Sequence, residues 1–151
     1  MIHGLPAISG ASGGELSWNI FKVDCPSIKL GVDAREIDMI PRFTIKNYEY
    51  DDLSVSFIES SELKFRYFFY QWMTKALGPD SYTRNYYSHV VASSFEIHPI
   101  DFNGNSSIAD VFHEILPYDI NSINYDIMDD GTQTALTTVK FKYMRHLMKK
   151  L

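Results

Sequence analysis

The segment 61–77, SELKFRYFFYQWMTKAL, constrains the fold of this chain more than any other part of the sequence. Its apolar residues recur at helical spacing and leave almost no polar face, with one stripe made of Phe65, Phe69, Trp72 and Ala76. Ser60 or Ser61 can cap the helix, and Glu62 suits its first turn. Gly78-Pro79 ends it. A helix that is apolar nearly all round has to be covered on more than one side.

The rest of the chain offers little to cover such a helix. With 151 residues it fits a single domain, and such a domain presents one sheet face to the helix. Aromatic residues reach 15% of the sequence, and they favour rigid cores and protein interfaces. We therefore expect a neighbouring subunit to supply the second cover. The candidate interface residues are Phe65, Phe68, Phe69 and Trp72.

Two segments have the alternation of half-buried antiparallel strands. In 53–58, LSVSFI, apolar residues alternate with serines, and in 136–144, LTTVKFKYM, they alternate with Lys140 and Lys142. The segments 42–48 and 90–102 also read as strands. About six or seven strands and one main helix predict a mainly β, α+β fold, an antiparallel β-sandwich or small barrel.

The connections between these strands follow from turn signals. Pro26 and Ser27 predict a hairpin in which 28–32 returns along a strand formed by 16–25, with 33–41 as a connector. Ser106 or Ser107 can cap a short turn of helix around 108–115. The segment 116–127 reads as a loop and then a strand, and Asp130-Gly131 predicts a further hairpin.

The N-terminal segment differs from the rest of the chain. Residues 4–14 contain four Gly, two Ser and a Pro, without hydrophobic periodicity. We expect a flexible arm over 1–15, ordered only against a neighbour, and a single domain over 16–151.

Charge and cysteine usage narrow the function classes. The net charge of −5 argues against a protein that binds nucleic acid through its phosphates. Cys25 is the only cysteine, which excludes an intrachain disulfide and a four-thiolate zinc site and favours a reducing compartment. The sequence shows neither a signal peptide nor the roughly 20 apolar residues of a membrane span, so we expect no membrane association.

A search for catalytic chemistry returns only weak candidates. The five histidines lack zinc-ligand spacing, and GASGGE (10–15) has neither the preceding strand nor the lysine of a phosphate loop. The acidic pairs Asp51-Asp52 and Asp129-Asp130 could serve as metal-binding or catalytic carboxylates. A structural role explains them as well: Asp51-Asp52 would precede a strand and Asp129-Asp130 would start a turn. Cys25 has no neighbouring base, so we expect an inert thiol. The interpretation is a non-enzymatic protein without a cofactor or metal, and a small β-rich enzyme is the remaining alternative.

Four segments in order resemble the tail tube proteins of contractile bacteriophages. They are NIFKVDC (19–25), YEYDDLSVSF (48–57), the helix with its Trp72, and LPYDINSINYDIMDDGTQTALTTVKFKY (116–143). The family has a leading Asn-Leu-Phe-x-Val strand, an aromatic-Asp-Asp element before an alternating strand, an aromatic helix, and a Leu-x-Pro segment before the last hairpin. The matching positions are Asn19, Ile20, Phe21, Val23, Tyr50, Asp51, Asp52, Val55, Trp72, Ile115, Leu116, Pro117, Ile123, Tyr125 and Phe141.

The resemblance implies a structural virion protein. Protomers of this family form hexameric rings that stack into a hollow tube inside a contractile sheath, and type VI secretion tube proteins share the fold. Expected partners are further copies of the chain, the tail sheath and baseplate proteins, while genomic DNA passes through without specific binding. The expected location is the virion tail, assembled in the host cytoplasm.

Two features of the resemblance affect the position in the tail. The family usually carries a longer segment before the aromatic-Asp-Asp element, which contacts the adjacent ring, and only 33–47 is available for it here. The C-terminal RHLMKKL is also unusually basic. Besides a repeating tube subunit, a baseplate-proximal or tube-end protein and a type VI-like injection tube subunit stay open.

A conduit for DNA must not hold its phosphates, and carboxylates on its wall repel them over roughly 8 Å at physiological salt. We expect Lys140 and Lys142 to point outwards or to pair with acids. At least two of five acidic residues beside the predicted strands should face the channel: Asp51, Asp52, Glu96, Asp101 and Asp126.

Overall fold

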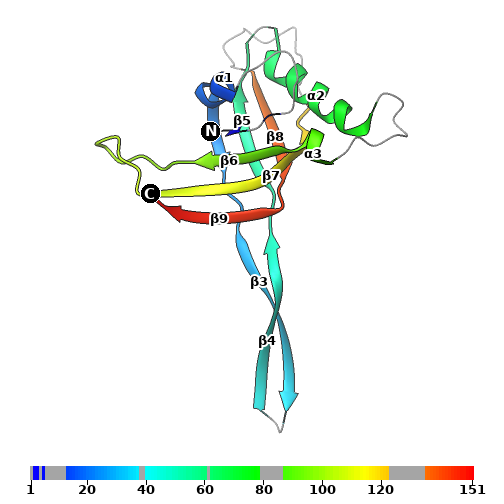
Figure 1. The fold of residues 1–151 in the computed structure, drawn as a ribbon, viewed down its shortest axis with the longest axis vertical. Helices are drawn as coiled ribbons and strands as arrows, with labels where there is room; N and C mark the ends of the chain where they lie inside the picture. The colour runs from blue at the N-terminus through cyan, green and yellow to red at the C-terminus, as the bar shows by residue number, and fades with distance from the viewer. Residues whose placement is uncertain are drawn as a thin grey trace, which may run out of the picture.

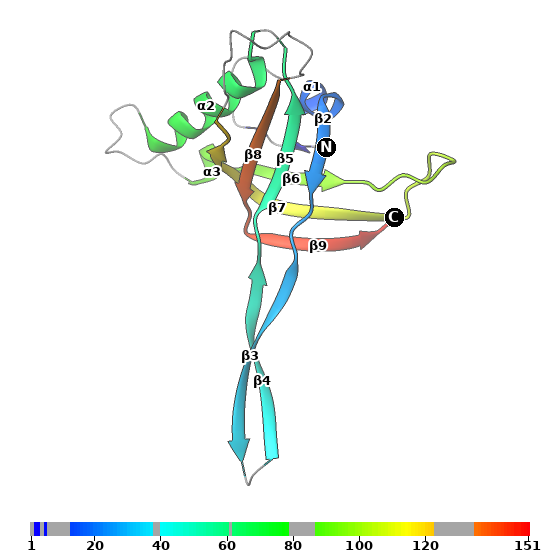
Figure 2. The same cartoon turned by 180° about the vertical axis from the view of Figure 1, so that it is seen from behind.

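The computed structural model describes residues 2, 3, 5, 13–37, 40–60, 62–78, 87–122 and 135–151. Its body is a mainly antiparallel β structure that curls into a half-barrel (Figure 1). A long two-stranded hairpin extends from this body (Figures 1 and 2). The predicted fold class is confirmed.

Two groups of strands make up the curled sheet. One contains β1 (Ile2–His3), β6 (Ala92–Ile97), β7 (Ile108–Ile120) and β9 (Arg145–Lys150), and the other contains β2 (Ile20–Asp24), β5 (Leu53–Ile58) and β8 (Leu136–Lys142). Strand β7 belongs to both, because its first half pairs with β6 and β9 and its second half with β8. It changes direction at Glu114, whose φ of 53° lies in the left-handed region. A bend of this kind lets one strand pass from one sheet to the other.

The alternation in the two predicted strands is confirmed. Leu53, Val55 and Phe57 of β5 are fully buried, and Val139 and Phe141 of β8 lie on the same face. Lys140 and Lys142 are exposed. The sheet therefore has one apolar face towards the core and one polar face.

Helix α2 (Lys64–Leu77) covers the apolar face of the sheet. Phe69 lies 5.1 Å from Phe57 and 5.7 Å from Phe141 between ring centroids, and Trp72 donates its indole N–H to the carbonyl of Val90 at the end of α3 (Tyr87–Val90). The helix starts later than predicted. Neither Ser60 nor the left-handed Leu63 caps it through a side chain, and Ser61 lies outside the described residues. The buried Glu59 carboxylate accepts the N–H groups of Phe65 and Arg66 instead, at 3.2 and 2.6 Å.

Three predicted elements are wrong. The segment around 108–115 is part of strand β7 and not a helical turn. Residues 13–18 form helix α1 (Gly13–Trp18), so the strand expected over 16–25 is limited to β2, and Trp18 is 90% exposed. Strand β2 pairs with β5 and not with 28–32. The segment 116–120 continues β7, whereas the hairpin expected at Asp130-Gly131 lies outside the described residues.

Parts of the segment 1–15, for which a flexible arm is expected, belong to secondary-structure elements. Ile2 and His3 pair with Phe95 and Ser94 of β6, and 13–15 belong to α1. Helix α1 places Leu16, with no exposed surface, in the core.

Candidate assembly interface

Residues 33–37 and 40–41, predicted as a connector, belong to the largest protrusion of the molecule. Strands β3 (Ile28–Ile37) and β4 (Ile40–Tyr50) pair only with each other and form the long hairpin that extends from the body (Figures 1 and 2). The shortened contact segment predicted over 33–47 is therefore wrong, because the hairpin spans 28–50.

Register places the apolar residues of this hairpin on one face. Residues opposite each other in an antiparallel pair share a face, and Leu30 lies opposite Tyr48, Val32 opposite Ile45, and Ala34 opposite Phe43. A register shift between Gly31 and Val32 keeps the apolar residues of the inner and outer halves of the hairpin on the same face. We call this the apolar hairpin face: Ile28, Leu30, Val32, Ala34, Phe43, Ile45, Tyr48 and Tyr50. The opposite face is polar and comprises Lys29, Gly31, Asp33, Arg35, Arg42, Thr44, Asn47 and Glu49.

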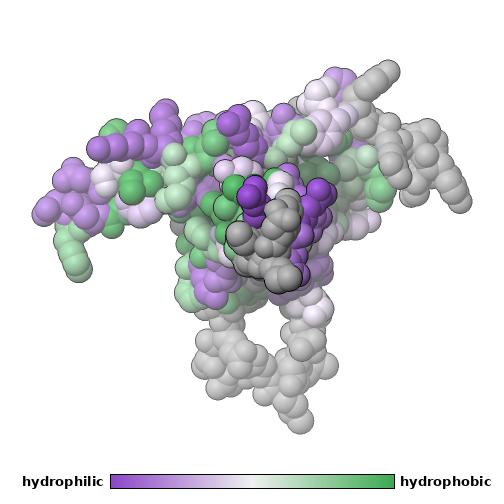
Figure 3. All heavy atoms as spheres, turned by 90° about the horizontal axis from the view of Figure 1, so that it is seen from below, coloured by the Kyte–Doolittle hydropathy of each residue, from purple (hydrophilic) through white to green (hydrophobic). Residues whose placement is uncertain are grey.

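The apolar hairpin face is open to solvent. Phe43 is 72% exposed, Ile45 66% and Val32 53%. Figure 3 looks at the hairpin end-on from its tip and shows hydrophobic residues exposed beside it on this side of the molecule. An isolated two-stranded hairpin is marginally stable in water, and a contiguous exposed apolar surface marks an interaction site. Packing against another molecule would both stabilise the hairpin and cover its apolar surface.

The aromatic-Asp-Asp element forms the root of the hairpin. The Asp51 carboxylate accepts a hydrogen bond from the Ser27 hydroxyl and lies 3.4 Å from the Lys29 ammonium, while its backbone carbonyl accepts the Tyr143 hydroxyl at 2.9 Å. The Tyr143 ring packs against Tyr50 with centroids 5.5 Å apart. These contacts connect both strands of the hairpin to the end of β8.

Asp52 makes a second connection at the root. Its carboxylate pairs with the Lys142 ammonium and accepts the Tyr118 hydroxyl. The hydrogen bonds from Lys142 and Tyr118 lower the pKa of Asp52, and those from Ser27 and Lys29 lower the pKa of Asp51. The hydrogen bond to Asp52 in turn raises the pKa of Tyr118 to about 12. The two ionised aspartates therefore hold the base of the hairpin against the body of the molecule.

The other predicted channel acids have local partners. Glu96 lies 3.1 Å from the imidazole of His98, and Asp101 accepts two backbone N–H groups of its own loop. Asp126 lies outside the described residues.

The polar face of the β2–β5–β8 sheet is charge-balanced. Lys22 pairs with Asp24 at 2.8 Å, Lys140 pairs with Asp119 at 3.1 Å, and Lys142 pairs with Asp52. Between these pairs the Ser56 and Thr138 hydroxyls hydrogen bond at 2.9 Å. The prediction that Lys140 and Lys142 pair with acids is confirmed.

The predicted interface residues of the helix are core residues. Phe65, Phe68, Phe69 and Trp72 are between 0% and 5% exposed within one chain, so they are not available to a neighbour. Their cover comes from the same chain, because Phe69 packs against β5 and β8 and Trp72 hydrogen bonds to the end of α3. The exposed aromatic residues of α2 are Tyr67 and Tyr70.

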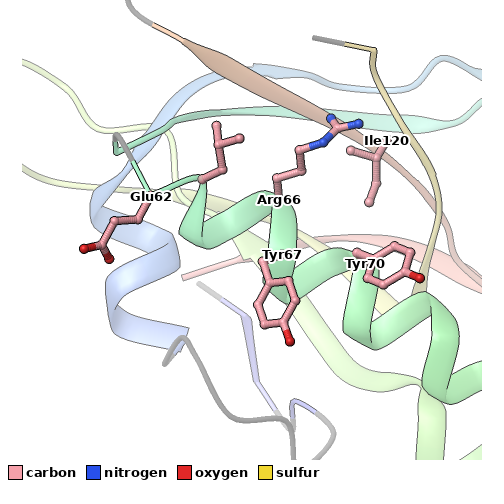
Figure 4. Close-up of a pocket in the computed structure, with 6 residues that line it drawn as sticks. Glu62, Arg66, Tyr67, Tyr70 and Ile120 are labelled. Atoms are coloured by element: carbon pink, nitrogen blue, oxygen red, sulfur yellow. The ribbon is translucent and has the colours of Figure 1, made fainter.

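These tyrosines line a groove on the outer side of α2 (Figure 4). The groove has a volume of about 330 Å³ and is lined by Glu62, Leu63, Arg66, Tyr67, Tyr70 and Ile120. We call it the α2 groove. Arg66 is held beside it, because its guanidinium donates to the carbonyl of Asn121.

Of the candidate metal ligands, Asp51 and Asp52 lie in the described part of the chain, as does the single cysteine. The described residues contain no group of His, Cys, Asp or Glu that could hold a metal ion. Cys25 is exposed, and desolvation followed by the nearby Asp110 and Asp24 carboxylates raises the pKa of its thiol. No helix in the described part of the chain could span a membrane.

No protein-family model and no curated protein sequence matches the chain, whereas solved structures do. The tube-terminating cap of the anti-feeding prophage aligns with a TM-score of 0.63 and 8% identity over 87% of this chain and 80% of that one. A chain of the sheath-tube complex of the extracellular contractile injection system PVC aligns with a TM-score of 0.57 and 8% identity, over 87% and 81%. The Hcp protein aligns with a TM-score of 0.50 and 11% identity, over 87% and 76%.

At these identities the similarity concerns the fold. The matched structures come from the class of proteins that the sequence resemblance indicated, and the curled antiparallel sheet with its helix is common to them. The chain therefore has the tube-protein fold that contractile injection systems share with type VI secretion tubes.

Proposed function

We propose that the protein is a non-enzymatic structural subunit of the inner tube of a contractile phage tail. In this proposal hexameric rings of the chain stack inside the sheath and end at the baseplate, and the tube conducts DNA during ejection. The observation that carries the proposal is the uncovered apolar hairpin face on a chain with a tube-protein fold. A protomer that leaves such a surface open needs a partner to cover it.

The hairpin suits contact between successive rings. It extends away from the body, so its apolar face can reach a molecule beyond the edge of the protomer's own ring (Figure 1). The root contacts of Asp51 and Asp52 hold its direction fixed, which lowers the entropy that would be lost on docking.

The polar face of the β2–β5–β8 sheet is our candidate for the channel wall. Its lysines are each paired with a carboxylate, so it offers DNA hydroxyl groups and balanced charge rather than free cations. Asp24, Asp52 and Asp119 are the acids of this proposed wall. Of these three, only Asp52 is among the channel acids predicted from the sequence.

Imaging the purified protein by negative-stain electron microscopy tests the assembly. We expect hollow rings and stacked tubes, formed either spontaneously or on an added baseplate. Monomers under every condition, including seeding with a baseplate, would contradict the proposal.

A baseplate-proximal or tube-end subunit is the second candidate. The similarity to a tube-terminating cap, with a TM-score of 0.63, favours it. Rings that form but never stack in the microscope would indicate this position, whereas tubes of indefinite length would indicate a repeating subunit.

A further inference from the structure

The loop between β6 and β7 presents an aromatic side chain to solvent. Phe102, at the tip of this loop, has a relative exposure of 112%, and the neighbouring Ile100 is 69% exposed. Nothing in the described part of the chain packs against the Phe102 ring. A fully exposed phenylalanine is a costly feature unless a partner buries it.

The loop holds this residue in a fixed position. The Asp101 carboxylate accepts the N–H groups of Asn103 and Asn105, both at 2.8 Å. The Asp101 backbone also exchanges hydrogen bonds of 3.0 Å with Gly104 and Asn105. Gly104 supports the turn with a φ of 80°. Because the loop is ordered by its own backbone and Asp101, Phe102 is presented before any partner arrives.

The α2 groove has the size and lining to receive such a side chain. Its volume of about 330 Å³ exceeds the about 150 Å³ of a cavity known to bind benzene. Tyr67 and Tyr70 supply aromatic surface, while Leu63 and Ile120 supply aliphatic surface (Figure 4). Aromatic pairs of this kind contribute beyond the area they bury.

A chain cannot fill its own groove. In both views the β6–β7 loop lies at one end of the β6–β7–β9 sheet, and α2 lies on the opposite side of the body (Figures 1 and 2). The occupant would have to be the loop of another copy. Two different surfaces on opposite sides of a protomer produce a head-to-tail contact, and such contacts close into rings when the rotation permits.

Both surfaces carry charges of both signs. Asp101 precedes Phe102, and Arg66 lines the groove. On the loop side the end of β9 adds Lys149 and Lys150, and the chain end is tied to the loop by the Leu151 N–H, which donates to the Ser107 carbonyl at 3.1 Å. Glu62 lies at the rim of the groove, so an acid and a base are present on each side of the proposed contact.

We propose that Phe102 of one protomer inserts into the α2 groove of the next, and that this head-to-tail contact closes the ring. The inference rests on the proposed function, because it names the lateral contact of the assembly. It is separate from the hairpin, which we assign to contacts between rings.

Site-directed cross-linking tests the contact in the full-length chain. In a Cys25→Ser background, Asn103→Cys and Glu62→Cys variants are prepared separately and mixed with a short bismaleimide. Both positions are exposed beside the proposed contact, and both variants keep Phe102 and the tyrosines of the groove. We expect a cross-linked heterodimer from the mixture, no product from either variant alone, and a ladder ending at a closed ring from the double variant. Thr44→Cys, exposed on the hairpin, replaces Asn103→Cys as the matched control and should give no product with Glu62→Cys.

Truncation of the side chain gives an independent readout. Phe102→Ala leaves the hydrogen bonds of Asp101 intact, so the monomer should keep its circular dichroism spectrum and its melting temperature. We expect the yield of rings by sedimentation and microscopy to fall at least tenfold, whereas Ser93→Ala, an exposed change on β6, should leave it unchanged.

The possible failures are distinguishable. Normal rings with Phe102→Ala and no 103–62 product would overturn this inference and leave the tube proposal standing. A dimer of Asn103→Cys with itself would also overturn it, because it would indicate a symmetric contact. Absence of any product and of any ring would overturn both proposals.

Discussion

Glu59 shows how a single residue substitutes for the expected helix cap. It follows β5 in the chain, and its carboxylate turns back to accept the first free N–H groups of α2. The Glu59 residue is only 8% exposed, so these hydrogen bonds form in a shielded environment. The left-handed Leu63 reverses the chain direction just before the helix and brings its N-terminus over Glu59.

Replacing Glu59 with alanine should destabilise the protein by about 0.5–2 kcal/mol, the range for loss of a helix cap. Two N–H groups would lose their acceptor at a position where water reaches poorly. Urea denaturation followed by circular dichroism measures the change. Glu62→Ala is the matched control, because Glu62 is exposed and accepts neither N–H group; an equal effect of both changes would contradict the capping role.

At the scale of elements, the hairpin combines an outer part that makes no contact with the body and a root that is firmly attached. Along most of its length β3 and β4 contact only each other, whereas Tyr50, Asp51 and Asp52 connect the root to β8. Tyr143 is part of this root, and partial desolvation raises its pKa to about 12. The docking proposed for the apolar hairpin face and the orientation proposed for its root can therefore be tested separately.

The docking role predicts an asymmetry between the two hairpin faces. Phe43→Asp places a charge on the apolar hairpin face and should abolish tube formation, since docking would bury an unpaired carboxylate. Thr44→Asp places the same charge on the polar face and should have a much smaller effect. Neither residue contacts the core, so the stability of the monomer should change by no more than about 0.5 kcal/mol in either case. Equal tube yields for the two variants, measured by sedimentation, would contradict the docking role.

The orientation role predicts a dependence on pH. The pKa values of Asp51 and Asp52 are lowered in the folded chain, so their contribution is present above the unfolded value of about 3.9 and is lost as the pH falls through the folded values. The pKa of Tyr118 is raised to about 12, so its contribution is complete below about pH 10 and is lost as the pH rises to about 12. Between these acidic and alkaline pH limits the root should hold the hairpin in its orientation.

Tyrosinate absorbance measures the alkaline part of this prediction. Asp52→Asn removes the charge that holds the Tyr118 proton and should return its titration towards about pH 10, with Tyr118→Phe identifying the affected transition. Asp24→Asn is the control, because Asp24 pairs with Lys22 and not with a tyrosine. An unchanged Tyr118 titration in Asp52→Asn would show that Asp52 does not hold the root.

At the scale of the whole molecule, the protomer has two kinds of surface. The apolar hairpin face, the Phe102 loop and the α2 groove are apolar or aromatic, while the polar face of the β2–β5–β8 sheet is charge-balanced. The first kind favours assembly, and the second kind suits a wall past which a polyanion can move.

If the polar face of the β2–β5–β8 sheet lines the channel, neutralising its acids should make the channel bind DNA. The double variant Asp24→Asn and Asp119→Asn would leave Lys22 and Lys140 unpaired, and symmetry would repeat both charges around every ring. We expect assembled tubes of this variant to retain short duplex DNA with an affinity that falls steeply with salt, whereas the native tubes retain none at about 0.15 M salt. Asp33→Asn, which frees Lys46 on the hairpin, is the control. Retention by the control alone would assign the wall to another face.

Local sequence pattern is enough to predict two strands and the main helix. Alternation in 53–58 and 136–142 follows from a strand with one face in the core and one in water, and the helical spacing of the aromatic residues in 64–77 predicts a helix packed against the core. The resemblance of ordered segments correctly predicted the tube-protein fold. The position of Asp51 and Asp52 directly before a strand could also be predicted, whereas their partners Ser27, Lys29, Tyr118 and Lys142 could not.

Other elements form only because of pairing with residues far away in the chain. In 108–115 the residues Ile108, Val111, Phe112 and Ile115 have helical spacing, yet β6 and β9 pair with both edges of this segment and make it a central strand. The same holds for 28–50, where a turn at Pro26 was locally reasonable but pairing of β2 with β5 left β3 to pair with β4. Which aromatic residues of α2 are buried depends on their packing against Phe57 of β5, Phe141 of β8 and the end of α3. Hydrogen-bond pairing and burial between residues far apart in the chain settle such choices, and no local pattern encodes them.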